Sequence, residues 1–215
     1  MRFKSREHAA QQLIEKLSPI YLHQNPLVLG IPRGAVSMGR IIADALGGEL
    51  DIVLVRKLSH PDQPEFAIGA IDETGQAFLA EWATDVDPQV IEAEKQRQLN
   101  VLRERRARYT PTREPIDAYD RIVIVVDDGI ATGSTMTAAL RAVRARGARK
   151  LIGAVAVASP DAAHAVLQEC DSMVCLKVSA NFFAVGQFFE DFSQVSDQDV
   201  IAALRGNDAR ASAAE

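Results

Sequence analysis

The sequence is poor in metal-binding and redox-active side chains: its 215 residues include two cysteines and four scattered histidines. Cys170 and Cys175 lie on either side of the start of a predicted strand. No further thiols or histidines stand at the spacing of metal ligands, which excludes a zinc site of the usual kind. We interpret both cysteines as packing residues in a reducing compartment.

Long apolar runs are also missing. No stretch approaches the roughly 18 apolar residues of a membrane-spanning helix, and the polar segment 1–7 lacks the apolar core of a signal peptide. The net charge of −5 argues against a general nucleic-acid binder, which needs a basic surface. The 47% of hydrophobic and 25% of charged residues are typical of globular proteins. The length of 215 residues predicts a single domain over residues 1–215, and the polar N-terminus and the reduced cysteines lead us to expect a cytoplasmic protein.

The pattern of apolar residues predicts alternating strands and helices. Helices are predicted over 5–17, 36–46, 88–108, 134–146, 161–169 and 196–204. Short apolar runs predict strands over 27–31, 51–57, 121–127, 150–158 and 172–178, and the segments 66–71 and 77–82 flank a hairpin turn at 72–75. This alternation favours an α/β fold with a mostly parallel central sheet and helices on both faces.

The segment 121–135 carries the strongest functional signal. Five apolar residues place Asp127 and Asp128 at the C-terminal edge of the sheet, where open α/β folds bind ligands. Residues 132–135, Thr-Gly-Ser-Thr, then open a helix. Backbone N–H groups at a helix N-terminus, together with hydroxyls, form a cradle for phosphate. Carboxylates just before it can accept hydrogen bonds from vicinal hydroxyls, so the pattern indicates a ribose 5-phosphate site.

Each half of this segment also has a plainer explanation. Two aspartates before a glycine often only end a strand in solvent, and a Thr-Gly-Ser-Thr run often only caps a helix. Their combination directly after an apolar strand is far rarer than either. The P-loop and the G-x-G-x-x-G fingerprint are both missing, so a P-loop kinase or a Rossmann dehydrogenase would lack its phosphate motif.

The segment resembles the phosphoribosyl-pyrophosphate signature of type I phosphoribosyltransferases. The resemblance runs from about residue 27 to 178, and the ends are most similar to a sparsely characterised bacterial subgroup of the family. It implies that the two aspartates hold the ribose hydroxyls and that the following loop holds the 5′-phosphate. The residues so assigned are Asp127, Asp128, Gly129, Ala131, Thr132, Gly133, Ser134 and Thr135.

Two further segments are similar to the family's pyrophosphate contacts. Pro32, Arg33 and Gly34 follow the first core strand, and Arg56 and Lys57 end the next one. By themselves, the first would be ordinary turn chemistry and the second a pair of surface cations. In relatives one such cation reaches pyrophosphate, sometimes across a dimer, which leaves a homodimer as an open alternative.

The resemblance also implies a flexible loop over 58–82 and a small hood over the base, built from the N-terminal helix and about 179–205. Phe182 or Phe183 is our candidate for stacking on that base. Enzymes acting on 6-oxopurines usually carry an aspartate where this chain has Ala131, which disfavours hypoxanthine and guanine. An acid or base must then come from elsewhere, and Glu65 is the candidate.

The expected activity follows from these assignments. The resemblance implies a Mg²⁺-dependent transfer of the 5-phosphoribosyl group from phosphoribosyl pyrophosphate to a nitrogenous base, with release of pyrophosphate. Asp127, Asp128, Lys57 and Glu65 are the expected catalytic residues, and no metal ligand is assigned. The alternative is a protein that keeps the phosphoribosyl-pyrophosphate site but uses it as a non-catalytic sensor or regulator.

Overall fold

The computed structural model describes residues 2–60, 63 and 66–205. Its central sheet has five parallel strands, as the strand–helix alternation predicts. In spatial order these are β2 (Glu49–Ile52), β1 (Leu27–Gly30), β6 (Ile122–Ile130), β7 (Lys150–Ala158) and β8 (Ser172–Val178). The fold class expected from the sequence is confirmed.

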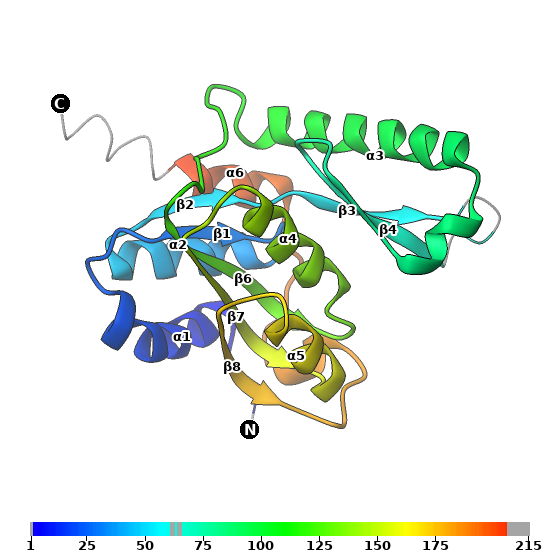
Figure 1. The fold of residues 1–215 in the computed structure, drawn as a ribbon. Helices are drawn as coiled ribbons and strands as arrows, with labels where there is room; N and C mark the ends of the chain where they lie inside the picture. Colours follow the sequence, from blue (N-terminus) through cyan, green and yellow to red (C-terminus); the bar gives the residue numbers. More distant parts are fainter. Residues whose placement is uncertain (1, 61–62, 64–65, 206–215) are drawn as a thin grey trace.

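Helices cover both faces of this sheet (Figure 1). On one face lie α1 (Arg6–Tyr21) and α2 (Ala35–Leu46), and on the other lie α4 (Ser134–Ala145) and α5 (Pro160–Leu167). Strand β6 is sandwiched between them: Ile124 and Val126 join the apolar core under α1 and α2, whereas Val123 and Val125 join the core under α4. This two-sided burial explains why the strand is an unbroken apolar run.

The predicted strand over 51–57 is wrong, because the chain changes sheets within it. Strand β2 ends at Ile52, and β3 (Val55–Ser59) pairs instead with β4 (Ala67–Asp72) in a second, antiparallel sheet. The residues between them, Val53 and Leu54, are both buried but in different apolar clusters. The hydrophobic run therefore continues through the bend, and periodicity gives no sign of it.

The second sheet is completed by β5 (Ala77–Leu79), which is shorter than the predicted strand over 77–82 because the 3₁₀ helix η1 (Glu81–Asp85) follows. The predicted turn is confirmed: the Asp72 side chain accepts from the backbone N–H groups of Thr74 and Gln76, and Gly75 has φ +94°. Much of the segment assigned to a flexible loop is thus hairpin. We call β3, β4, β5 and α3 (Pro88–Tyr109) the arm, which extends beyond the central sheet (Figure 1).

The N-terminus pairs with a distant segment near the C-terminal end of the chain. The backbone N–H of Phe3 donates to Phe188 O (2.8 Å), at the end of the 3₁₀ helix η2 (Val185–Phe188), and Glu190 N–H donates back to Phe3 O (2.8 Å). This pairing sets the first turn of α1 beside residues 188–193. Helix α6 (Asp197–Arg205) follows and packs on α2.

Most helix limits agree with the predicted ranges, but α1 continues to Tyr21 and has Pro19 inside it. The buried side chains of Leu17 and Tyr21 extend its packing past the predicted end. None of the helices in the described part of the chain is long and apolar enough to cross a membrane.

Candidate active site

The two aspartates singled out by the sequence lie within β6 near its C-terminal end, because the strand runs to Ile130 rather than to residue 127. Strand alternation sends them to opposite faces. Asp128 continues the row of Ile124 and Val126 toward α1 and α2, and Asp127 continues the row that faces α4. The backbone N–H of Asp128 donates to Oδ1 of Asp127 (2.9 Å). The pair therefore stands between the loops that precede α2 and α4.

Burial governs the protonation of both groups. It raises the pKa of Asp127 well above its ordinary value, and the neighbouring charge of Asp128 raises it further. Burial also raises the pKa of Asp128, although the guanidinium of Arg6 opposes this shift. Two adjacent carboxylates with raised pKa values are typical of a functional site rather than of a solvated strand end.

The most important neighbour of this pair is Arg6, which sequence reasoning missed. Its Nε donates to Oδ2 of Asp128 (2.8 Å), and its Nη1 donates to Ser193 O (2.8 Å). The guanidinium carbon lies 3.9 Å from the centre of the Phe192 ring. One sequence signal was available: a cation in the first turn of a helix opposes the helix dipole, which favours acids there.

The predicted pyrophosphate loop packs directly against Asp128. A side chain on Gly34 would overlap Oδ2 of Asp128, so glycine at this position lets the loop and the carboxylate pack together. The Pro32–Arg33 peptide is cis, and Nη1 of Arg33 lies 3.7 Å from Oδ1 of Asp197 in α6. We call residues 179–205 the hood segment. A cavity of about 360 Å³ opens between it and this loop, lined by Arg6, Arg33, Gly34 and residues 192–195.

The predicted phosphate loop leads into α4 as expected. Gly133 is the N-cap in the left-handed conformation (φ +75°), and it has no side chain with which to cap the first N–H groups of the helix. The Oγ atoms of Thr132 and Ser134 lie 3.1 Å apart, and Ala131 O accepts from Ser159 Oγ (2.7 Å). The N–H of Ser134 donates to Oγ1 of Thr132 (3.4 Å). Backbone N–H groups at a helix N-terminus beside two hydroxyls are suited to an anion.

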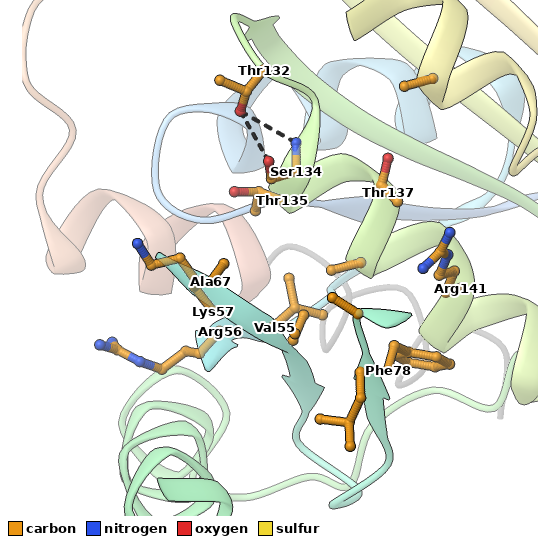
Figure 2. A pocket seen from close by; sticks show the side chains of 16 residues that line it. Val55, Arg56, Lys57, Ala67, Phe78, Thr132, Ser134, Thr135, Thr137 and Arg141 are labelled. Atoms are coloured by element: carbon orange, nitrogen blue, oxygen red, sulfur yellow. Dashed lines mark hydrogen bonds between the residues drawn. The ribbon is translucent and has the colours of Figure 1, made fainter. Parts of the chain in front are cut away.

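This loop shares a second cavity with the predicted strand-end cations. A space of about 360 Å³ lies between α4 and the arm, and Figure 2 shows Thr132, Ser134 and Thr135 at one end with Arg56 and Lys57 on the facing strand. The rest of its wall is largely apolar: Val55, Ala67, Ala70, Phe78, Leu79, Ala138 and Ala165. Arg56 is tied to the arm because its Nε donates to Gln98 of α3, whereas Lys57 is exposed.

The structure thus arranges the predicted residues in two groups around the end of β6. Pro32, Arg33 and Gly34 gather on the Asp128 side, and the 131–135 loop gathers with Arg56 and Lys57 on the α4 side. Gly129 packs closely on Val185 and Val157. Glu65 lies outside the described residues.

The two aromatic candidates lie in the hood segment. Phe183 is 91% exposed, and Phe182 packs on Phe188 with ring centres 5.1 Å apart. Phe192 instead covers the guanidinium of Arg6, which in turn donates to Asp128.

Near the end of α3, a helix rich in charged side chains, Arg106 is largely buried and paired rather than solvated. Its side chain is 11% exposed and pairs with Asp51 (2.9 Å) and Glu73 (2.5 Å). Asp51 also lies 3.4 Å from Arg113. These contacts tie α3 to β2 and to the hairpin turn, which gives Arg106 a structural role.

Comparison with known proteins identifies the family. A profile of the phosphoribosyl transferase domain matches residues 2–190. Over 205 residues the chain is 40% identical to two Mycobacterium tuberculosis proteins, from strains CDC 1551 / Oshkosh and H37Rv, both named as putative phosphoribosyl transferases. The match covers 94% of this chain but 46% of each relative, so the chain spans about half their length.

A solved structure gives the same fold. The crystal structure of TT1426 from Thermus thermophilus has a TM-score of 0.87 and 44% identity, and the match covers 96% of this chain and 99% of that one. The parallel sheet, with an acidic pair and a glycine loop at its C-terminal edge, defines an α/β protein whose sheet edge is suited to a phosphorylated ligand. The chain belongs to the phosphoribosyl transferase domain family.

Proposed function

We propose that the protein transfers the 5-phosphoribosyl group of phosphoribosyl pyrophosphate to a nitrogenous base and releases pyrophosphate. The observation that carries the proposal is the contact of Gly34 with Asp128, since it brings the predicted pyrophosphate loop onto the predicted ribose carboxylates. The phosphate loop follows three residues later in the chain. Family membership supports the same reaction.

In the proposed reaction, each part of the site has one role. Asp127 and Asp128 accept hydrogen bonds from the ribose hydroxyls and stabilise the positive charge that develops at C1′. The N–H groups and hydroxyls of residues 132–135 hold the 5′-phosphate. As the base nitrogen bonds to C1′, the C1′–O bond to pyrophosphate breaks, and Arg33 and Lys57 stabilise the departing charge. The proton of the base nitrogen needs an acceptor, for which Glu65 stays a prediction.

We propose Mg²⁺ as the metal of this reaction. Within the described ranges, no three His, Cys, Asp or Glu side chains gather closely enough to hold a metal ion. This fits an ion that arrives with the substrate, because Mg²⁺ is commonly bound through phosphate oxygens and water with few protein ligands. Such an ion would neutralise part of the pyrophosphate charge.

Ala131 narrows the range of bases that can accept the phosphoribosyl group. The backbone carbonyl of Ala131 accepts from Ser159, and its methyl side chain has no proton to exchange with a base. We therefore propose a base other than a 6-oxopurine. Adenine and uracil are the first candidates, since the enzymes that use them also resemble this chain at that position.

The direct test measures the release of pyrophosphate from phosphoribosyl pyrophosphate in the presence of Mg²⁺. Each nucleobase of a panel is added in turn, and a reaction without any base is the control. Base-dependent release that is lost in Asp127→Asn supports the transferase. Tight binding of phosphoribosyl pyrophosphate without turnover by any base supports the alternative, a sensor or regulator. Failure to bind phosphoribosyl pyrophosphate at all would remove both functions.

A further inference from the structure

Arg6 makes contacts that an ordinary surface arginine does not. Its guanidinium is held on three sides: by Oδ2 of Asp128 at 2.8 Å, by Ser193 O at 2.8 Å and by the ring of Phe192 at 3.9 Å. On the remaining side is the pyrophosphate loop, where a Cβ on Gly34 would lie 3.1 Å from Nε and 3.2 Å from Nη2. The group thus lies where three separate chain segments meet the acidic pair.

This ion pair is shielded from solvent. The side chains of Arg6 and Asp128 are 11% and 13% exposed, respectively. A pair shielded in this way is screened little by salt and is more sensitive to loss of one partner than a surface pair. Arg6 also cannot shift freely, because the backbone pairing of Phe3 with Phe188 and Glu190 anchors the start of α1 beside the hood segment.

The electrostatics give Arg6 a role that packing alone does not explain. Asp127 and Asp128 are adjacent, and both are desolvated, so two negative charges here repel each other. Arg6 compensates one of them. Its single Nε–H uses one acceptor position of a carboxylate that has about four, which leaves capacity for a ribose hydroxyl.

We propose that Arg6 is a positioning residue of the phosphoribosyl site: it fixes the orientation of the Asp128 carboxylate toward the ribose and ties it to the hood segment. This inference rests on the proposed function. It makes the N-terminal turn part of the substrate site, although that turn carries none of the sequence motifs that indicate the site.

The opposite role makes the opposite prediction. If the ion pair instead kept Asp128 away from the ligand, Arg6 would inhibit binding, and its removal would tighten the complex. The sign of the change in affinity therefore separates positioning from obstruction.

The test is a double-mutant cycle on phosphoribosyl-pyrophosphate binding, with affinities measured by calorimetry for the wild type, Arg6→Gln, Asp128→Asn and the double variant. We expect Arg6→Gln to weaken binding roughly tenfold or more, since hydrogen bonds to charged groups are worth about that much. In the Asp128→Asn background the same change should have less than about a threefold effect, because Arg6 acts through that carboxylate.

Two further variants separate positioning from general stability. Arg6→Lys keeps the charge and should recover part of the lost affinity. Arg144→Gln removes an ion pair with Asp171 at the far end of α4 and should bind as the wild type does. If Arg6→Gln does not fold, as judged by thermal melting, the cycle is run with Arg6→Lys in its place.

Each outcome decides the matter. The positioning role would be overturned if the effects of Arg6→Gln and Asp128→Asn on the binding free energy simply add, or if Arg6→Gln binds more tightly. Either result would leave the proposed function intact. A wild-type protein that does not bind phosphoribosyl pyrophosphate would instead remove the proposed function, and the role of Arg6 with it.

Discussion

Gly34 and Asp128 are in direct contact, and the carboxylate Oδ2 occupies the place where a side chain of residue 34 would be. The contact joins the loop before α2 to the end of β6. It means that the position of the loop and the orientation of the carboxylate cannot change independently.

Gly34→Ala should therefore disturb the site more than the fold. The new methyl group would displace the carboxylate of Asp128, and with it the ion pair to Arg6. We expect phosphoribosyl-pyrophosphate affinity to fall at least tenfold, with stability lowered by the roughly 1–3 kcal/mol typical of overpacking. Calorimetry and thermal melting measure the two effects. Gly39→Ala, where a Cβ would lie 2.8 Å from Cδ1 of Leu50 in the core under α2, is a matched control for added bulk away from the site. Unchanged affinity in Gly34→Ala would show that the loop does not contribute to the site.

Asp127→Asn should make the protein more stable and less active. In the folded protein the pKa of Asp127 is well above its ordinary value. Stability contributed by this group is therefore present below the ordinary pKa of aspartate and is lost as pH rises through the folded pKa. Asparagine cannot ionise and avoids that loss. Thermal melting should show a higher melting temperature for the variant at about pH 8 and a smaller difference at about pH 4.

Binding of phosphoribosyl pyrophosphate should move in the other direction. Loss of one charged hydrogen bond to the ribose costs about 1.5–3 kcal/mol, or roughly 10- to 150-fold in affinity. A variant that is more stable but binds as the wild type does would show that Asp127 is not a ribose ligand. A variant that is less stable at high pH would contradict the raised pKa.

Even substitution by alanine should not be tolerated at Gly133. Its φ of +75° is costly for residues with a side chain, by about 1–2 kcal/mol, and a Cβ would lie 3.3 Å from both Ala162 O and Val166 Cγ2 of α5. Gly133→Ala should lower both stability and the affinity for ribose 5-phosphate, and Gly133→Val should abolish that binding. Titration with ribose 5-phosphate and with ribose separates the phosphate contribution. A folded Gly133→Val protein with normal affinity would contradict the cradle.

The two adjacent cations of β3 should differ in function. Arg56 donates to Gln98 of α3, and burial together with Arg105 and Arg97 lowers its pKa. Lys57 is exposed at the rim of the cavity shared with the phosphate loop. We expect Lys57→Gln to weaken pyrophosphate binding several-fold with little change in melting, and Arg56→Gln to lower the melting temperature. Inhibition by pyrophosphate and thermal melting curves measure these two effects. Weaker pyrophosphate binding by Arg56→Gln, with Lys57→Gln unchanged, would instead make Arg56 the pyrophosphate ligand.

Local sequence patterns determined much of the secondary structure and part of the candidate site. The five apolar residues of β6 predicted a strand buried on both faces, and Gly47 with φ +69° ends α2 where the sequence places that end. The acidic pair and the 132–135 loop were also visible, because their chemistry lies within one continuous segment. Caps, turns and periodicity act over a few residues, so sequence alone reveals them.

The features that only the tertiary structure reveals depend on contacts between residues far apart in the chain. The sequence does not reveal the bend at Val53 and Leu54, because both residues are buried and the apolar run continues through the bend. The ion pair of Arg6 with Asp128, and that of Arg106 with Asp51, join residues from different elements. A charged side chain looks the same in a sequence whether it is solvated or paired. Only packing, which removes water and brings particular partners within reach, determines which of the two it is.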